Sequence, residues 1–284
     1  MQVVALRRDL ADVLRSPSRS SPRPCLRTRP PLKTRMVCMA VELVDLTHPV
    51  VSGMPVYPGD PGVELRAALT AEVEGVNVLA VHLGSQTGTH VDAPYHLDVR
   101  WPTLDGLPLE LFTGPAVVVD LRGLPARGEV TAGHLAEALA VSGPGTVLLL
   151  ATGWPRYWGT DRYFAHPYLS EEAAAAIVAA GVRTVGVDAL SVDPTPDPGP
   201  SDPEVASLLA ELADEHDPAP ELPTLAAHRV LLGPEGGGVI AENLTDLSPL
   251  LEAQAAGVPV EVSLFPLRLT AADGAPVRAV ARIG

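Results

Sequence analysis

An eleven-residue segment in the first half of the chain concentrates the side chains that could do chemistry. It runs from Gln86 to His96 and contains two imidazoles, a carboxylate and an amide. His90 and Asp92 are two residues apart, so in an extended backbone they point the same way and could hold one divalent cation. Pro94 stops a central strand or a helix and places His96 on a turn leaving the site, where it could transfer protons. We therefore predict a metal site beside a catalytic histidine, rather than a set of packing histidines.

The same segment resembles the signature His-x-Gly-Thr-His-x-Asp-x-Pro-x-His of the cyclase family, which includes bacterial kynurenine formamidases and isatin hydrolases. One position departs from it, because Gln86 stands where His is usual. The resemblance extends over about residues 42–283. Further matching motifs follow in the same order along the chain: DLTHP at 45–49, PVYPGD at 55–60, GVD at 186–188, SVDP at 191–194, ENL at 242–244 and ADGAPVRA at 272–279.

The resemblance implies a set of metal ligands and a proton-transfer residue, His96. Gln86 offers one neutral amide oxygen, a weaker ligand for zinc than imidazole, so it favours a harder ion such as Mn²⁺. We expect Mn²⁺ or Zn²⁺, either as one ion or as two ions bridged by Asp92. The implied metal ligands are Gln86, His90, Asp92, His228 and Glu242.

Two other residues compete for places in this ligand set. His82 lies four residues before Gln86, on the same face of a regular strand, and could replace the missing imidazole, although a strand histidine is more often a packing residue. Glu235 competes with Glu242 because the interval from His228 to Glu242 is about two residues longer than the resemblance leads us to expect. We prefer Glu242, which lies in the Glu-Asn-Leu motif, whereas Glu235 lies in a glycine-rich turn.

The resemblance implies hydrolysis of an amide or lactam C–N bond in a small molecule, most simply an aromatic amide. The metal would lower the pKa of the attacking water, and His96 would take the proton and return it to the leaving amine. The first candidate is the arylformamidase reaction of tryptophan catabolism, from N-formylkynurenine to kynurenine and formate. Hydrolysis of isatin or of a lactone, a secondary-metabolite cyclase activity, and binding without catalysis stay open as alternatives.

Aromatic residues offer a substrate surface at two places. Tyr57 falls where kynurenine formamidases resemble one another in carrying an aromatic residue, and we expect it to stack on a substrate ring. A cluster at 154–164 could line the same pocket, or it could anchor a loop or a dimer contact instead.

Charge is distributed unevenly along the 284 residues. Residues 1–36 hold nine of the 20 Lys and Arg residues but two of the 34 acidic ones, so the remainder is strongly acidic. Such a surface repels nucleic acid and anionic membranes, which argues against both as partners. The longest apolar run is also far shorter than the ~20 residues that a membrane helix requires.

The basic start of the chain has three interpretations. It could be a targeting segment, a disordered tail, or untranslated sequence with Met36 or Met39 as the true initiator, and we favour the last. We therefore divide the chain into an extension, 1–40, and one hydrolase domain, 41–284. Both cysteines, Cys25 and Cys38, lie in this extension, so the domain has no thiolate nucleophile. The resemblance further implies a homodimer and a cytoplasmic location.

The secondary-structure elements predicted to position the site include both helices and strands. Helices are predicted at 131–140 and 170–180, with Thr131 and Ser170 as N-caps. A third is predicted at 204–214, within a Pro-rich interval at 193–223 that could form an active-site flap, a partner-facing arm or a solvated loop. The resemblance makes this an α+β chain of the swivelling β/β/α type, a small mixed barrel-like sheet flanked by helices. Short β-branched runs predict strands at 41–46, 76–83, 116–121, 147–151, 182–187, 230–232, 239–241 and 260–266.

Overall fold

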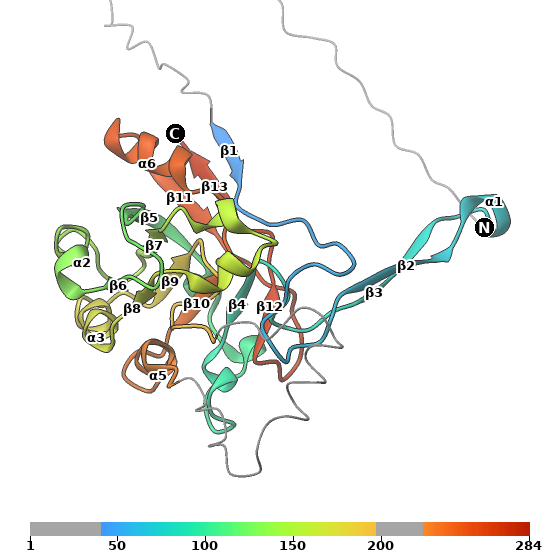
Figure 1. Cartoon of the computed structure of the whole chain (residues 1–284), viewed down its shortest axis with the longest axis horizontal. Coiled ribbons are helices and arrows are strands. Elements are labelled where there is room, and N and C mark those ends of the chain that lie inside the picture. The colour runs from blue at the N-terminus through green and yellow to red at the C-terminus, as the bar shows by residue number, and fades with distance from the viewer. Residues whose placement is uncertain (1–40, 197–223) are drawn as a thin grey trace, which may run out of the picture. The chain divides into compact units, whose positions relative to one another are not determined.

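The computed structural model describes residues 41–196 and 224–284. In this part of the chain, strands join into one mixed sheet in the order β1-β13-β11-β5-β7-β9-β10-β4-β12 (Figure 1). Strands β5, β7, β9 and β10 run parallel to one another, and the remaining pairings are antiparallel. The curled sheet confirms the α+β class and the barrel-like architecture. Its strands are β1 (Glu42–Asp45), β4 (His90–Asp92), β5 (Thr113–Asp120), β7 (Val147–Ala151), β9 (Thr184–Val187), β10 (Val239–Glu242), β11 (Val260–Ser263), β12 (Gly274–Pro276) and β13 (Val280–Ile283).

The central strands send alternate side chains into two hydrophobic cores. Along β7, Val147 and Leu149 pack into one core, whereas Leu148 and Leu150 pack into the other, as the two-residue period of a strand requires. The first core includes residues of α6, and the second includes residues of α2, α3 and α5, which lie together on one side of the sheet in Figure 1. Burial on both faces explains why the parallel strands are continuously apolar. The helices are α2 (Ala132–Leu139), α3 (Glu171–Ala179), α5 (Ala226–Leu232) and α6 (Ser248–Ala255).

The two helices predicted with N-caps are confirmed. Thr131 and His134 form a capping box at the start of α2. The Ser170 hydroxyl accepts a hydrogen bond of 3.1 Å from the backbone N–H of Ala173 at the start of α3. After α3, Gly181 has a φ of +82°, which a glycine adopts without strain and which ends the helix.

One predicted strand is wrong. The run at 230–232 lies in α5, where Ala227 and Leu231 face the second core. A short apolar run does not distinguish a buried strand from one buried face of a helix, and here the helix also carries His228. The sequence reading also omitted β12, β13 and α6. The predictions for 1–40 and 204–214 lie outside the described residues.

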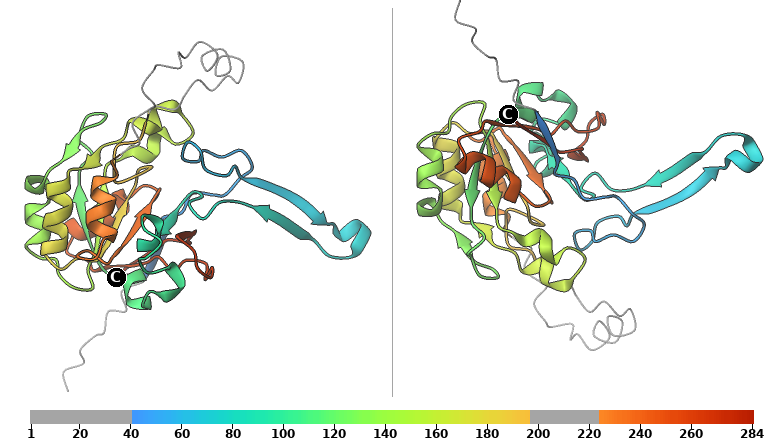
Figure 2. Two further views of the ribbon diagram at one scale, coloured as in Figure 1. Left: turned by 90° about the horizontal axis from the view of Figure 1, so that it is seen from below. Right: turned by 90° about the horizontal axis from the view of Figure 1, so that it is seen from above.

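A two-stranded hairpin forms a separate element. It consists of β2 (Glu64–Leu69), the short helix α1 (Ala71–Glu74) and β3 (Val78–His82), and it extends away from the large sheet in Figure 2. Most of its apolar side chains are exposed. A further small pair joins β6 (Glu129–Val130) to β8 (Tyr168–Leu169) in parallel. Among the described residues, no helix is long and apolar enough to cross a membrane.

Candidate metal centre and active site

Strand β4 carries two of the predicted ligands and is paired on both sides. His90 lies opposite Glu242 of β10, and Asp92 lies opposite Gly274 of β12. The extended backbone expected for this segment is therefore present, and a 3-10 helix at Pro94–His96 turns the chain away after it. The strand pairing brings a carboxylate from residue 242 next to the motif at 86–96.

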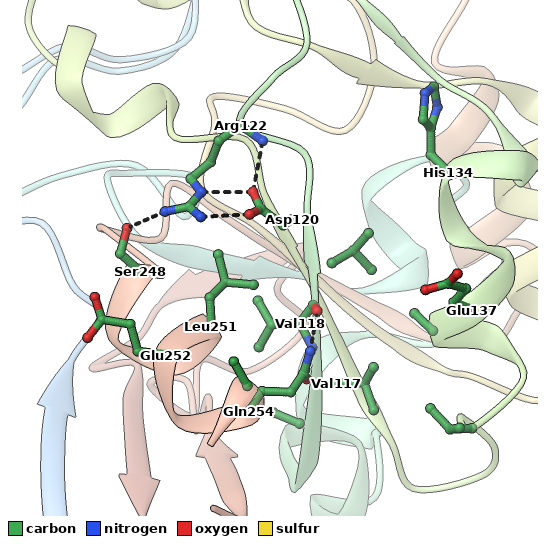
Figure 3. A pocket seen from close by; sticks show the side chains of 15 residues that line it. Val117, Val118, Asp120, Arg122, His134, Glu137, Ser248, Leu251, Glu252 and Gln254 are labelled. Atoms are coloured by element: carbon green, nitrogen blue, oxygen red, sulfur yellow. Dashed lines mark hydrogen bonds and ion pairs between the residues drawn. The ribbon is translucent and has the colours of Figure 1, made fainter. Parts of the chain in front are cut away.

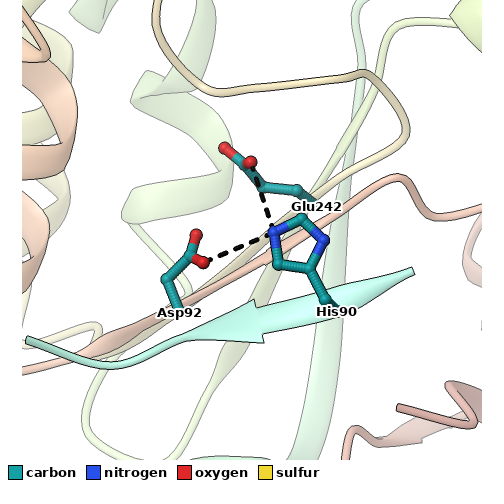
Figure 4. A group of neighbouring side chains, drawn as sticks. All are labelled: His90, Asp92 and Glu242. Carbon is teal, nitrogen blue, oxygen red and sulfur yellow. Dashed lines mark ion pairs between the residues drawn. The ribbon is translucent and has the colours of Figure 1, made fainter. Parts of the chain in front are cut away.

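Four side chains from β4, β10 and α5 form one cluster, in which the Asp92 and Glu242 carboxylates lie between the two imidazoles. Nε2 of His90 lies 3.4 Å from Asp92 Oδ1 and 3.7 Å from Glu242 Oε2. Nε2 of His228 lies 3.6 Å from Asp92 Oδ2 and 3.4 Å from Glu242 Oε1. Two ligand atoms that share one tetrahedral zinc ion, each about 2.0–2.2 Å from it, lie roughly 3.3–3.6 Å apart. Figure 4 shows His90, Asp92 and Glu242 converging in this way.

The imidazoles are held with one nitrogen directed at the two carboxylates. Nδ1 of His90 lies 2.8 Å from the carbonyl oxygen of Gly88, and Nδ1 of His228 lies 2.6 Å from Asp193 Oδ2. Since both partners accept hydrogen bonds, each Nδ1 carries a hydrogen, and each Nε2 is the nitrogen that could bind a cation. On the carboxylate side, Glu242 Oε1 accepts a hydrogen bond of 2.9 Å from the Val192 N–H.

The donor set fits a divalent cation. Both carboxylate oxygens of Asp92 are buried and have no hydrogen-bond partner among the described residues. Burial lowers the pKa of His90, but Asp92 and Glu242 outweigh it and raise that pKa to about 9. Positive charge is thus favoured in this cluster, and a metal ion can supply it in place of protons. Imidazole nitrogen and carboxylate oxygen suit zinc and manganese alike.

His228 reaches the cluster from α5, the helix that replaces the strand predicted at 230–232. Asp193 accepts hydrogen bonds from the backbone N–H groups of Ala227 and His228, both at 2.9 Å, at the first turn of α5. The same carboxylate orients the His228 ring. Asp193 is therefore a functional residue that the sequence reading missed, although it lies in the SVDP motif.

The structure separates the competing ligand candidates. His82 is exposed on the hairpin and Glu235 is exposed after α5, whereas Glu242 is buried in the cluster. Gln86 directs its Nε2 to Asp273 Oδ2 at 2.9 Å, and its buried Oε1 has no partner in the described part of the chain. Its role as a ligand stays a prediction, and Oε1 is the atom that could fill it.

A cavity of about 480 Å³ opens onto the cluster. Tyr57, Gln86 and His96 line it together with His90, Asp92, His228 and Glu242. The aromatic side chains at 154–164 do not line it; they pack in the second core, where Trp154 and Tyr163 are fully buried. Among the described residues, Tyr57 is the only Phe, Trp or Tyr lining this cavity, which fits its predicted contact with substrate.

A larger cavity, of about 1050 Å³, lies elsewhere, between α2 and α6 over β5 (Figure 3). Gln254 bonds both the N–H and the C=O of Val118 there, and Arg122 pairs with Asp120. These polar groups satisfy one another, and its lining contains no described metal-ligand cluster. The smaller cavity is therefore the candidate active site.

His96 is paired with a carboxylate at the cavity edge. Its Nδ1 lies 3.3 Å from Asp273 Oδ2. Burial lowers the pKa of His96, but the bond to Asp273 and the charges of Asp92 and Glu242 together outweigh it, so this pKa rises. In return, the bonds from His96 and Gln86 hold the pKa of Asp273 well below its ordinary value, against the effect of burial. Asp273 is a second residue of the site to which the sequence reading gave no role.

Comparison with known proteins agrees with this geometry. The Cyclase family model matches residues 44–194. The kynurenine formamidase of Bacillus cereus (strain ATCC 14579) is 30% identical over 244 residues, which cover 85% of this chain and 97% of the relative. That of Bacillus cytotoxicus is 29% identical over 246 residues, covering 86% and 98%.

Solved structures share the fold. Isatin hydrolase A from Labrenzia aggregata, bound to benzyl benzoate, aligns with a TM-score of 0.66 and 22% identity over 86% of this chain and 94% of that one. An isatin hydrolase bound to the product analogue thioisatinate aligns with a TM-score of 0.67 and 18% identity, covering 85% and 92%. Because the Cyclase family model matches residues 44–194 and a relative that is 30% identical aligns over 85% of the chain, this protein belongs to the Cyclase family.

Proposed function

We propose that this chain is a metal-dependent hydrolase that cleaves the C–N bond of a small aromatic amide, with N-formylkynurenine as the first substrate to test. One observation carries the proposal: the two unpartnered oxygens of Asp92, buried between two imidazoles and a second carboxylate at the base of a cavity. The kynurenine formamidase relatives support an acyclic amide. The fold shared with isatin hydrolases supports a lactam as the second candidate.

The residues divide the work between binding and proton transfer. His90, Asp92, His228 and Glu242 would hold the cation, which activates water and polarises a carbonyl when bound. His96 lies outside that set, and its ring centroid is 6.0 Å from that of His228. From there it can take the proton of the attacking water and deliver it to the leaving nitrogen. Tyr57 offers an aromatic face for the substrate ring.

Metal removal is expected to abolish the activity. Purified protein should contain Mn²⁺ or Zn²⁺, and elemental analysis should give one ion per chain, or two if Gln86 Oε1 completes a second site. Dialysis against a chelator should stop hydrolysis, and adding back either metal should restore it. A folded protein that contains no divalent metal and gains no activity from one would contradict the hydrolase function and favour a binding role.

A substrate panel decides the chemical class. We expect the metal-loaded enzyme to hydrolyse N-formylkynurenine faster than isatin, with a lactone as the third arm, measured by absorbance change. Faster turnover of isatin or of the lactone would replace the substrate while preserving the metal chemistry.

We also propose that the chain forms a homodimer in the cytoplasm, as the family resemblance implies, and that the β2–β3 hairpin is the dimer interface. Leu79 and Val81, which share one face of β3, are 56% and 55% exposed. A row of exposed apolar side chains on an extended hairpin is typical of an interface.

Breaking that row is expected to shift the protein from dimer to monomer. Replacing both Leu79 and Val81 with Glu places charge in the interface, and light scattering after gel filtration should report half the wild-type mass. Val141→Glu is the matched control, since Val141 is 75% exposed at the end of α2 and outside the hairpin. A hairpin variant that keeps the wild-type mass would rule out this interface.

A further inference from the structure

The carboxylate of Asp273 contacts two side chains that line the cavity, Gln86 and His96, although Asp273 lies 177 residues after His96 in the sequence. Its Oδ2 lies 2.9 Å from Gln86 Nε2 and 3.3 Å from His96 Nδ1. The two nitrogens are themselves 3.3 Å apart. Because the carboxylate can only accept, Gln86 Nε2 donates to Asp273, and His96 donates to the same oxygen when its Nδ1 carries the hydrogen. In the other tautomer Nδ1 would accept from Gln86 and turn its lone pair toward the carboxylate, which is electrostatically unfavourable.

This arrangement determines which ring nitrogen of His96 is available. If Nδ1 carries the hydrogen bonded to Asp273, Nε2 keeps its lone pair. Among the described residues no group hydrogen-bonds Nε2, and His96 lines the cavity. A histidine that is to accept a proton from water needs such a free nitrogen, directed consistently by a partner on the other side of the ring.

The backbone around Asp273 is fixed on both sides. The N–H of Ala93 donates to the Asp273 carbonyl oxygen at 2.8 Å, and the N–H of Leu104 donates to the carbonyl oxygen of Ala272 at 2.9 Å. The next residue, Gly274, begins β12 and pairs with Asp92. Asp273 therefore lies directly before β12, the strand that pairs with β4, and β4 carries the two predicted ligands His90 and Asp92.

Gln86 fits this arrangement through the absence of a side chain at Gly274. A Cβ at that position would lie 2.7 Å from Gln86 Nε2 and 2.5 Å from the Val91 carbonyl oxygen. Gly274 thus leaves the space in which the Gln86 amide reaches Asp273. The amide end of Gln86 has a defined task here, distinct from any contact that its Oε1 makes with a cation.

We propose that Asp273 is a positioning residue, which holds His96 in the tautomer protonated at Nδ1, and that Gln86 holds Asp273 in place for this task. The role rests on the proposed hydrolase function, in which His96 transfers the proton. It assigns a task to the Ala-Asp-Gly segment at the end of the chain and a second task to the position at which this chain departs from the family signature.

Two readouts test the role, and one of them does not depend on activity. In zinc-loaded protein labelled with ¹⁵N-histidine, long-range ¹H–¹⁵N spectra report which nitrogen of each ring is protonated, and the His96→Ala variant assigns the His96 signals. Wild-type His96 should be protonated at Nδ1. In Asp273→Ala this tautomer should lose its dominance, whereas Asp273→Asn, which keeps an acceptor, should retain part of it.

The kinetic readout is a double-mutant cycle. Asp273→Ala should lower kcat by about 10–100-fold, the range typical of partners that orient a functional histidine, with KM and zinc content within about twofold of wild type. In the His96→Ala background the same substitution should cost less than about threefold, because its effect acts through His96. Asp120→Asn is the control, because Asp120 pairs with Arg122 and does not line the cavity that contains His96.

An unchanged His96 tautomer in Asp273→Ala, or losses that multiply fully in the double variant, would overturn the positioning role. If instead the wild-type protein binds zinc but hydrolyses none of the amides, the proposed function fails. The NMR spectra would still decide whether Asp273 sets the tautomer of His96.

Discussion

Asp92→Asn is expected to empty the metal site and to lower hydrolysis by about 1,000-fold, equivalent to about 4 kcal/mol of lost transition-state stabilisation. Asp92 stands between His90 and His228, and both of its oxygens face the cluster without a hydrogen bond from the described residues. Asparagine has nearly the same shape, but it removes the charge and turns an N–H₂ group toward the cation. Elemental analysis after gel filtration and a parallel rate measurement would check this.

Asp188→Asn provides the matched control for Asp92. Asp188 is equally buried, but its oxygens accept hydrogen bonds from Thr152 and Gly153 rather than facing the cluster. The variant should lose stability while keeping the metal, because an N–H group that now donates to the Asp188 carboxylate would face the N–H₂ group of the asparagine amide. If both variants lost metal to the same degree, the effect of Asp92→Asn would reflect general damage to the core rather than loss of a ligand.

His96→Ala, unlike Asp92→Asn, is expected to keep the metal while losing turnover. General acid–base catalysis by a positioned side chain contributes about 10²–10⁴-fold, and kcat should fall within that range. His96 is bonded to Asp273 rather than to the cluster, so the zinc or manganese content should equal that of wild type. Measuring metal content and kcat on the same preparation separates the two effects.

His82→Ala is the comparison for this variant. His82 is exposed on β3, four residues before Gln86, and its removal should leave both metal content and turnover unchanged. Loss of metal in His96→Ala would show that His96 is a ligand, which would contradict its assignment to proton transfer.

The part of the site that sequence could predict is the part encoded locally. Alternation within β4 places His90 and Asp92 on one face, and this follows from the spacing alone. His228 could be named from the family resemblance, but its helix could not be predicted, because the apolar run after it has the composition of a strand. The caps at Thr131 and Ser170 were predictable since a cap depends on residues within one turn.

The orienting carboxylates show what sequence could not supply. Asp193 and Asp273 both lie in motifs that match the family, yet a motif gives no partner. Asp193 contacts His228, which lies 35 residues later in the sequence, and Asp273 contacts His96, which lies 177 residues earlier. These contacts depend on strand order in the finished sheet, which local patterns do not specify.

The pairing of β4 with β12, and of β1 with β13, has a consequence for how the enzyme is made. Glu42 of β1 lies opposite Ile283 of β13, and Asp92 of β4 lies opposite Gly274 of β12. Two strands from the first part of the described chain therefore pair with the two strands that come last in the sequence. A nascent polypeptide that has emerged as far as Glu242 already carries every implied metal ligand, but its ligand strand has an open edge. Such long-range closure is slow compared with helix formation. We therefore expect a chain truncated before residue 274 to aggregate rather than to retain partial activity.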